Sequence, residues 1–175
     1  MSYIASWGEN SSLSLSQLAG KALTLIALAT LLRVAEIAAI GLKSVKFSND
    51  AIHFSLKTRA RWVLFLLTNF LICCSVETIN DFIKATVAFR SGSEDERLWV
   101  SVKPPHGPVT ANTIAKRWIK NILKGSGIDT GTFSAHSTRS AAASQAVRDG
   151  WSTEAILRAG NWARESTCNR FYNRS

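Results

Sequence analysis

A long apolar stretch near the start of the sequence limits what this chain can fold into. Residues Ala22–Leu42 read ALTLIALATLLRVAEIAAIGL, which could cross a bilayer only with Arg33 and Glu36 in the middle of the span. A second apolar run, Trp62–Cys74, is shorter than the ~20 residues that a membrane helix requires. Burial in a protein core explains both runs better, the first as a pair of helices, and we expect no membrane partner.

The charge balance favours a polyanionic partner. The 175 residues, of which 46% are hydrophobic, suit one domain with one core. Lys and Arg number 21 against 12 Asp and Glu, which gives a formal net charge of +9. Residues 113–175 contain ten of these bases and four of the acids, so the last third of the chain is the most basic. Such an excess is typical of proteins that bind nucleic acid.

The cysteines and the first residues argue against a secreted protein. The three cysteines are an odd number and two of them, Cys73 and Cys74, are adjacent, so they cannot form the disulfide framework of a small secreted domain. The start, MSYIASWGENSSLSLSQ, lacks the basic and apolar regions of a signal peptide. No Cys/His spacing is typical of zinc ligands, and no metal is expected.

Hydrophobic periodicity predicts helices first and a small sheet next. Ser14 or Ser16 can cap a first helix, and Arg33 opens or continues a second helical turn to Ile40. After Gly41 the apolar period changes to two, which predicts a hairpin over residues 45–56 with Asn49-Asp50 as its turn. Residues 61–65 are a candidate third strand.

The rest of the chain is predicted to be helical. Ser75 can cap a helix through Ala88, RSGSEDER is expected to be a solvated loop, and Thr110 can cap a further helix. That helix has apolar residues on one face and a basic stripe elsewhere, formed by Lys116, Arg117, Lys120 and Lys124. Three short helices follow after residue 134, broken at Gly150 and near Gly160. The predicted fold class is α+β, mainly α, with a small antiparallel β-hairpin or sheet.

A few residues could carry chemistry on an anion. His136 and Arg139 are three apart at the start of a helix, which places an imidazole and a guanidinium on one face. Arg33 lies in apolar surroundings, where a charge is costly unless it meets a ligand or a partner such as Glu36. Trp162 follows a Gly-Asn break.

The ordered set resembles the catalytic domain of tyrosine recombinases, the phage-integrase family. Its members are Arg33 with Glu36, Lys57 in a hairpin turn, His136-Ser137-Thr138-Arg139, Trp162 and Tyr172. More narrowly, HSTRSAAASQAVRDGW, PPHGPVTANTIAKRWIK and STCNRFY look like the recombinases of eukaryotic DIRS-like and Crypton-like mobile elements. The resemblance assigns residues 13–175 to the catalytic domain and leaves residues 1–12 as an N-terminal tail. Type IB topoisomerases share the chemistry, but the HSTR sequence and the small size favour recombination.

The resemblance implies a role for each residue. Arg33, supported by Glu36, and Arg139 would bind the non-bridging oxygens of a DNA phosphodiester, because fixed guanidinium donors stabilise the charge that builds on phosphorus. Tyr172 would attack and form a 3′-phosphotyrosyl intermediate, and Lys57 would protonate the leaving 5′-hydroxyl. His136 would add a hydrogen bond or accept the tyrosine proton, and the Trp162 N–H would donate another. The partners implied are double-stranded DNA and further copies of the chain, with no cofactor.

Each assignment has a structural alternative. Arg33 and Glu36 could be an ordinary helix pair, and Lys57 a solvated turn lysine with Arg59 as a competing acid. His136 with Arg139 could be a surface pair, Trp162 a core aromatic, and Tyr172 a plain helix residue.

The family also suggests what this chain lacks. Its members usually carry a separate DNA-binding domain ahead of the catalytic one and a C-terminal docking segment, and we expect both to be absent here. A truncated DNA-binding remnant without catalysis is therefore one alternative, and a helical membrane or partner-binding protein is another. The expected location is the nucleus if the source is eukaryotic, and otherwise the cytoplasm.

Overall fold

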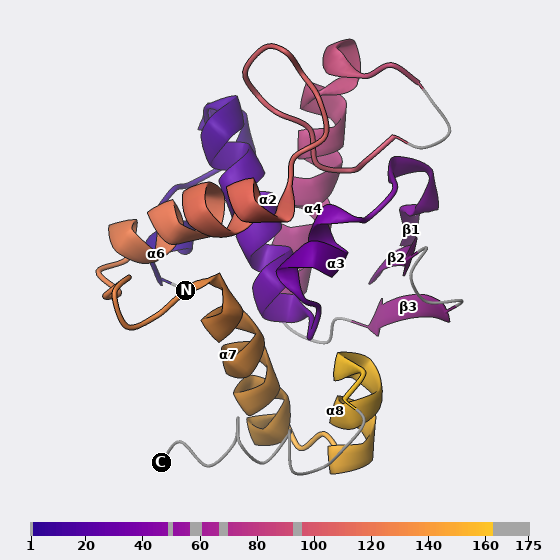
Figure 1. The fold of residues 1–175 in the computed structure, drawn as a ribbon, viewed down its shortest axis with the longest axis vertical. Helices are drawn as coiled ribbons and strands as arrows, with labels where there is room; N and C mark the ends of the chain where they lie inside the picture. The colour runs from indigo at the N-terminus through magenta and orange to yellow at the C-terminus, as the bar shows by residue number, and fades with distance from the viewer. Residues whose placement is uncertain (1, 49–50, 57–60, 67–69, 93–95, 163–175) are drawn as a thin grey trace.

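A pair of helices from the first apolar stretch forms the centre of the molecule (Figure 1). The computed structural model describes residues 2–48, 51–56, 61–66, 70–92 and 96–162. Helix α2 spans Leu15–Ala29 and helix α3 spans Val34–Ala38. Ser14 caps α2, since its hydroxyl accepts from the Gln17 N–H and its own N–H donates to the Gln17 side chain at 3.0 Å. The predicted helix pair is confirmed.

The segment assigned by sequence to an N-terminal tail packs against this centre. It contains helix α1, Ser2–Ala5, and the 3-10 turn η1, Asn10–Ser12. Ile4 is buried, and the Asn10 amide donates to Asp81 at 2.8 Å. Lys21 of α2 donates to the Gly8 carbonyl at 3.2 Å. These contacts tie the first residues to α2 and to the helix that carries Asp81.

The change to a period of two produces a three-stranded antiparallel sheet with the order β1-β2-β3. After the 3-10 turn η2, Leu42–Ser44, strand β1 spans Lys46–Ser48, β2 spans Ala51–Leu56 and β3 spans Arg61–Leu66. Phe47 lies opposite Ile52, and Phe54 lies opposite Val63. Both the hairpin and the third strand are confirmed.

Helix α4 spans Phe70–Ala85, so the prediction that a helix begins at Ser75 and runs to Ala88 is wrong at both ends. The second apolar run is divided between β3, which ends at Leu66, and α4, which begins at Phe70. Helix α4 packs against α2 and ends before the 3-10 turn η3, Val87–Phe89. Among the described residues, no helix has both the length and the hydropathy needed to cross a bilayer.

The ends of the predicted solvated loop, residues 90–97, are structural instead. The Arg90 guanidinium donates to the carbonyls of Arg97 and Leu98, each at 3.0 Å, and its burial lowers the pKa of this group, partly offset by Glu96. Arg97 in turn donates to the Ala39 carbonyl just after α3, at 2.5 Å. Charge at both ends therefore serves to anchor the loop to the core.

A single continuous helix follows Thr110, whose hydroxyl accepts from the Thr113 N–H at 3.2 Å. It consists of α5, Ala111–Thr113, the π-helical turn η4, Ile114–Ile119, and α6, Lys120–Gly125. The residues buried on its inner face are Ile114, Trp118, Ile119 and Ile122. The expected amphipathic helix is confirmed, with a π-helical turn in its middle.

Helices α7, Ala135–Arg148, and α8, Thr153–Gly160, lie at one end of the molecule, below α2, α3 and α6 in Figure 1. Helix α7 contacts α2, η4 and α8. Its hydroxyl cap, Ser134, accepts from the His136 N–H at 3.3 Å. The fold is mainly helical with a small sheet, as the sequence predicts. The third helix expected after residue 134 lies outside the described residues.

Candidate active site

Arg33 occupies the junction between α2 and α3 rather than the middle of an apolar helix. It is the N-cap residue of α3, and its side chain is 47% exposed. The Glu36 carboxylate accepts from the Arg33 backbone N–H at 2.7 Å and from its guanidinium at 3.3 Å. The break between the helices thus brings the charge to the surface, and Glu36 fixes its direction.

His136 and Arg139 lie in the first turns of α7, three residues apart as the sequence indicates. Ser134 begins the helix, and the Ser137 hydroxyl accepts from the Ser134 N–H at 3.1 Å. His136 is exposed and Arg139 is half-buried. The capped helix start therefore holds an imidazole and a guanidinium on one face.

Trp162 contacts Arg139 directly. Helix α8 ends at Gly160, Asn161 adopts a left-handed conformation with φ of 50°, and the backbone N–H of Trp162 donates to the Leu157 carbonyl at 3.0 Å. The Arg139 guanidinium carbon lies 4.5 Å from the centroid of the Trp162 ring, and its Nη2 donates to the Gly160 carbonyl. The turn after α8 thus places the Trp162 ring and the Gly160 carbonyl against the guanidinium of Arg139.

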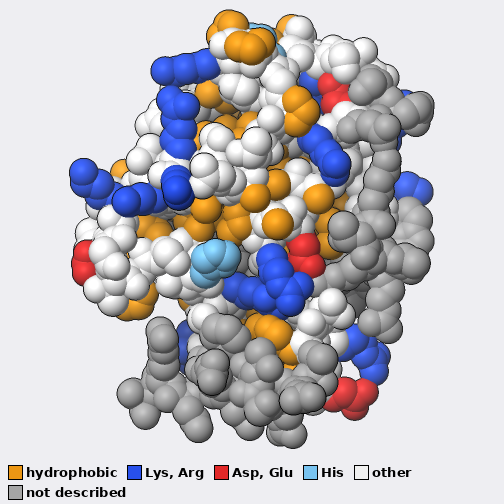
Figure 2. Space-filling model, viewed as in Figure 1, with side chains coloured by type: hydrophobic (Ala, Val, Ile, Leu, Met, Phe, Trp, Pro, Cys, Tyr) orange, Lys and Arg blue, Asp and Glu red, His pale blue; other side chains and the backbone are white. Residues whose placement is uncertain are grey.

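Shared hydrophobic clusters connect the segment that carries Arg33 to the same region. Leu31, two residues before it, belongs to one buried cluster with Trp162 and with alanines of α7. Ala135, at the start of α7, belongs to the cluster that contains Val34 just after Arg33. Figure 2 shows a histidine beside Lys/Arg side chains and an acidic side chain where the start of α7 meets α3. Guanidinium and imidazole groups are the donors that a phosphate requires, and the segments that carry them share these clusters.

Two predicted site residues lie outside the described residues. Lys57 directly follows β2 in sequence, and Tyr172 follows Trp162 by ten residues. Their roles as acid and nucleophile remain predictions.

The basic stripe is exposed on the outer face of the helix from α5 to α6. Its members are Lys116, Arg117, Lys120 and Lys124. Figure 2 shows Lys and Arg side chains gathered over α6. Because the opposite face packs into the core, this helix presents its charge outward in a fixed direction.

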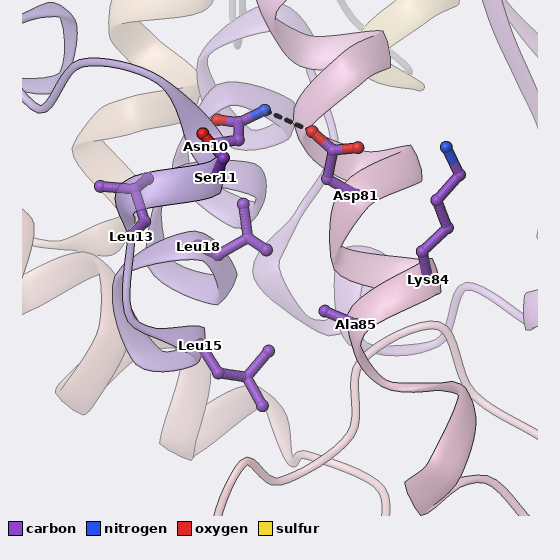
Figure 3. A pocket seen from close by; sticks show the side chains of 8 residues that line it. All are labelled: Asn10, Ser11, Leu13, Leu15, Leu18, Asp81, Lys84 and Ala85. Atoms are coloured by element: carbon purple, nitrogen blue, oxygen red, sulfur yellow. Dashed lines mark hydrogen bonds between the residues drawn. The ribbon is translucent and has the colours of Figure 1, made fainter.

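An open cavity of about 550 Å³ lies away from these residues, between the N-terminal segment and α4 (Figure 3). Leu13, Leu15 and Leu18 line it from one side and Asp81 and Lys84 from the other. It contains none of the candidate catalytic residues. In the part of the chain that the structure describes, no group of three or more His, Cys, Asp or Glu side chains is placed to hold a metal ion.

The sequence did not predict the loop that leads into α7. The Asp129 carboxylate accepts from the Thr132 hydroxyl at 2.6 Å and from the Gly131 N–H at 2.9 Å. These hydrogen bonds lower the pKa of Asp129, and the bond from the Thr132 hydroxyl has the larger effect. The signal was present in the Asp-Thr-Gly-Thr sequence, which is typical of a turn closed by an aspartate.

Comparison with known proteins identifies the family. The model of the phage integrase family matches residues 9–175. The chain belongs to the phage integrase family. This family is the one that the ordered set of Arg33, His136, Arg139, Trp162 and Tyr172 resembles.

Solved structures show the same fold. A XerA recombinase superposes with a TM-score of 0.73 at 18% identity, over 91% of this chain and 54% of that one. A XerH site-specific recombinase bound to its difH substrate superposes with a TM-score of 0.75 at 15% identity, over 99% of this chain and 47% of that one. A lambda integrase dimer bound to a COC' core site superposes with a TM-score of 0.60 at 16% identity, over 99% of this chain and 58% of that one. The chain spans about half the length of these proteins, and no curated protein matches it in sequence.

Proposed function

We propose that this chain is the catalytic domain of a site-specific recombinase that cuts and rejoins DNA strands through a 3′-phosphotyrosyl intermediate. The observation that carries the proposal is the fixed Arg139 guanidinium, held by Trp162 and Gly160 one helical turn from His136. A phosphodiester resists nucleophiles because it is an anion, and preorganised donors lower the cost of the charge that builds during attack.

The proposed reaction assigns each group the role that the family resemblance implies. Arg33 and Arg139 bind the non-bridging oxygens, His136 accepts the phenol proton, and the positive charge stabilises the phenolate of Tyr172, whose ordinary pKa is about 10. The phenolate oxygen attacks phosphorus, the bond to the 5′ oxygen breaks, and Lys57 donates the proton that makes the 5′-hydroxyl. A second strand's 5′-hydroxyl then attacks the phosphotyrosine and returns its proton to Lys57, and the tyrosine leaves and takes back the proton from His136. Because the same bond type is broken and formed, no external energy source is needed.

The basic stripe supplies the binding that is independent of this chemistry. Each lysine or arginine that neutralises a phosphate releases counterions, so affinity for duplex DNA should fall steeply with salt. Changing Lys116, Arg117 and Lys120 together to Ala should lower the slope of log affinity against log salt by about three. Lys84→Ala, which removes an exposed lysine of α4 outside the stripe, is the control, and it should lower the slope by less than one. An unchanged slope in the triple variant would make the stripe an ordinary solvated face.

The narrower family assignment belongs to the same proposal. The sequences around His136 and Trp162 support a recombinase of a DIRS-like or Crypton-like mobile element, which would act on DNA in the nucleus of a eukaryote, and otherwise in the cytoplasm. The lambda integrase structure is a dimer on DNA, and XerH is bound to its substrate. By analogy, this domain would act on double-stranded DNA together with further copies of itself.

Covalent capture tests the proposal. The protein is incubated with a pool of duplexes that have randomised sequences and one nick, so that the short fragment with the 5′-hydroxyl dissociates and the intermediate accumulates. Wild-type protein should form SDS-resistant adducts without added metal, with the nucleotide on Tyr172 by mass spectrometry. The Tyr172→Phe variant should bind the duplexes but form no adduct, because it lacks the nucleophilic oxygen. Salt-sensitive binding with no adduct from wild-type protein would identify a DNA-binding remnant instead.

A further inference from the structure

The turn that follows α8 has a conformation that few sequences allow. Asn161 lies in the left-handed region, with φ and ψ both 50°, and its N–H donates to the Arg158 carbonyl at 3.3 Å. Asparagine accepts this conformation far more readily than a β-branched residue. The chain therefore reverses within one residue and brings Trp162 back onto the end of the helix.

Gly160 is required by the same reversal. A Cβ at this position would lie 2.7 Å from Cε3 and 2.8 Å from Cζ3 of Trp162. The indole is 8% exposed and packs in the cluster with Leu31 and Ile156, so it has little room to retreat. Any side chain at residue 160 would displace the ring or the turn.

This turn holds the Arg139 guanidinium from two sides. The indole lies against the guanidinium plane at 4.5 Å, and the Gly160 carbonyl accepts from Nη2 at the edge of that plane. The carbonyl is one of the last of α8, where the helix dipole places partial negative charge. The ring contact and the hydrogen bond therefore approach the guanidinium at two different atoms, Cζ and Nη2.

We propose that Gly160 and Asn161 are positioning residues, which orient Arg139 for the scissile phosphate through the carbonyl of Gly160 and the ring of Trp162. The inference rests on the proposed function for its consequence in catalysis, but the positioning itself can be measured without DNA. The role requires no side chain at residue 160 and a left-handed conformation at residue 161.

Side-chain NMR of the labelled protein tests the positioning. In wild-type protein the Arg139 guanidinium should give separate, slowly exchanging N–H signals, assigned with Arg139→Lys. Gly160→Ala should collapse them to the averaged signals of a rotating side chain, without unfolding the protein. Gly107→Ala is the matched control, because a Cβ there meets nothing within 4 Å and φ is not left-handed. Unchanged Arg139 signals in Gly160→Ala would overturn the proposal.

A comparison of two substitutions at Asn161 separates the effect of the turn's backbone conformation from the effect of losing the asparagine side chain. Asn161→Gly should retain the ordered Arg139 signals, because glycine adopts positive φ without cost. Asn161→Val should lose them, since a β-branched residue disfavours that region. Equal signals in the two variants would show that the turn does not orient the guanidinium.

Cleavage kinetics test the consequence. Gly160→Ala should slow adduct formation at saturating DNA by about 10²-fold, the cost of misplacing a catalytic group by an ångström, while DNA affinity stays constant. In an Arg139→Ala background the same change should slow it by a much smaller factor, the part that passes through the Trp162 indole alone. An equal loss in both backgrounds would contradict the proposal. If wild-type protein forms no adduct, the proposed function fails, and the NMR comparison still decides the positioning.

Discussion

The molecule contains two hydrophobic clusters of different character. The larger one joins α2, β2, α4 and η4 and buries bulky side chains completely, among them Leu23, Phe54, Phe82 and Trp99. The smaller one joins Leu31 to α7 and α8 through alanines, Ile156 and the single large ring of Trp162. Burial of large side chains makes the first cluster the source of stability. The second lets helices approach closely, and it supports the guanidinium of Arg139.

Helix α7 connects the two clusters. Its first residue, Ala135, packs with the larger cluster, and Ala142, Ala143 and Ala146 pack with the smaller. His136 and Arg139 lie between these contacts, and Arg33 follows Leu31 on the neighbouring segment. The candidate site is therefore at the boundary of the two clusters, so its geometry depends on the packing of both.

The largest expected effect comes from breaking the larger cluster. Phe82 is 0% exposed and its ring lies 5.5 Å from that of Trp99. Phe82→Ala should lower the free energy of unfolding by about 3–5 kcal/mol, because it removes a large buried ring and leaves a cavity. Such a loss is a large fraction of the stability of a typical domain, and urea unfolding followed by circular dichroism would measure it. A midpoint equal to that of wild-type protein would show that this cluster is not the main source of stability.

Elements with local signals were predictable from the sequence, and elements decided by tertiary packing were not. Ser14 was identified as a candidate cap and the hairpin from the change of period, because caps and strand alternation depend on neighbouring residues. The start of α4 was placed wrongly at Ser75, since a serine signals a cap only when the preceding residues are not helical. The helix instead begins at Phe70, inside the second apolar run.

The same distinction applies to the candidate site. The spacing of His136 and Arg139 predicted one helical face, which the structure confirms. The Gly-Asn break before Trp162 was visible, but its contact with Arg139 was not, because a backbone carbonyl carries no signature in sequence. The support from Leu31 likewise depends on helices that are far apart in the chain. The order of residues thus indicated the chemistry, and the fold supplied the contacts that position it.

A matched pair of substitutions sharpens the comparison of the clusters. Ile79 in the larger cluster and Ile156 in the smaller are both 0% exposed. Ile79→Val and Ile156→Val should each lower the free energy of unfolding by about 0.5–1.5 kcal/mol, since each loses one buried methylene. Only Ile156→Val should also slow adduct formation, because its cluster supports Trp162. Equal rates for the two variants would mean that the smaller cluster does not set the geometry of the site.

The smallest effect is expected at Glu36, and it separates the two roles considered for Arg33. Glu36→Gln removes the charged partner of a guanidinium that is 47% exposed, so the free energy of unfolding should change by less than about 1 kcal/mol. If Arg33 binds the scissile phosphate, a loosened guanidinium should slow adduct formation by about fivefold, the equivalent of ~1 kcal/mol. Glu154→Gln is the matched control, because Glu154 pairs with the exposed Arg158 of α8 at 2.7 Å. It should alter stability as little and leave the adduct rate unchanged. If the two variants form adducts at the same rate as wild-type protein, the pair of Arg33 and Glu36 serves only to begin α3.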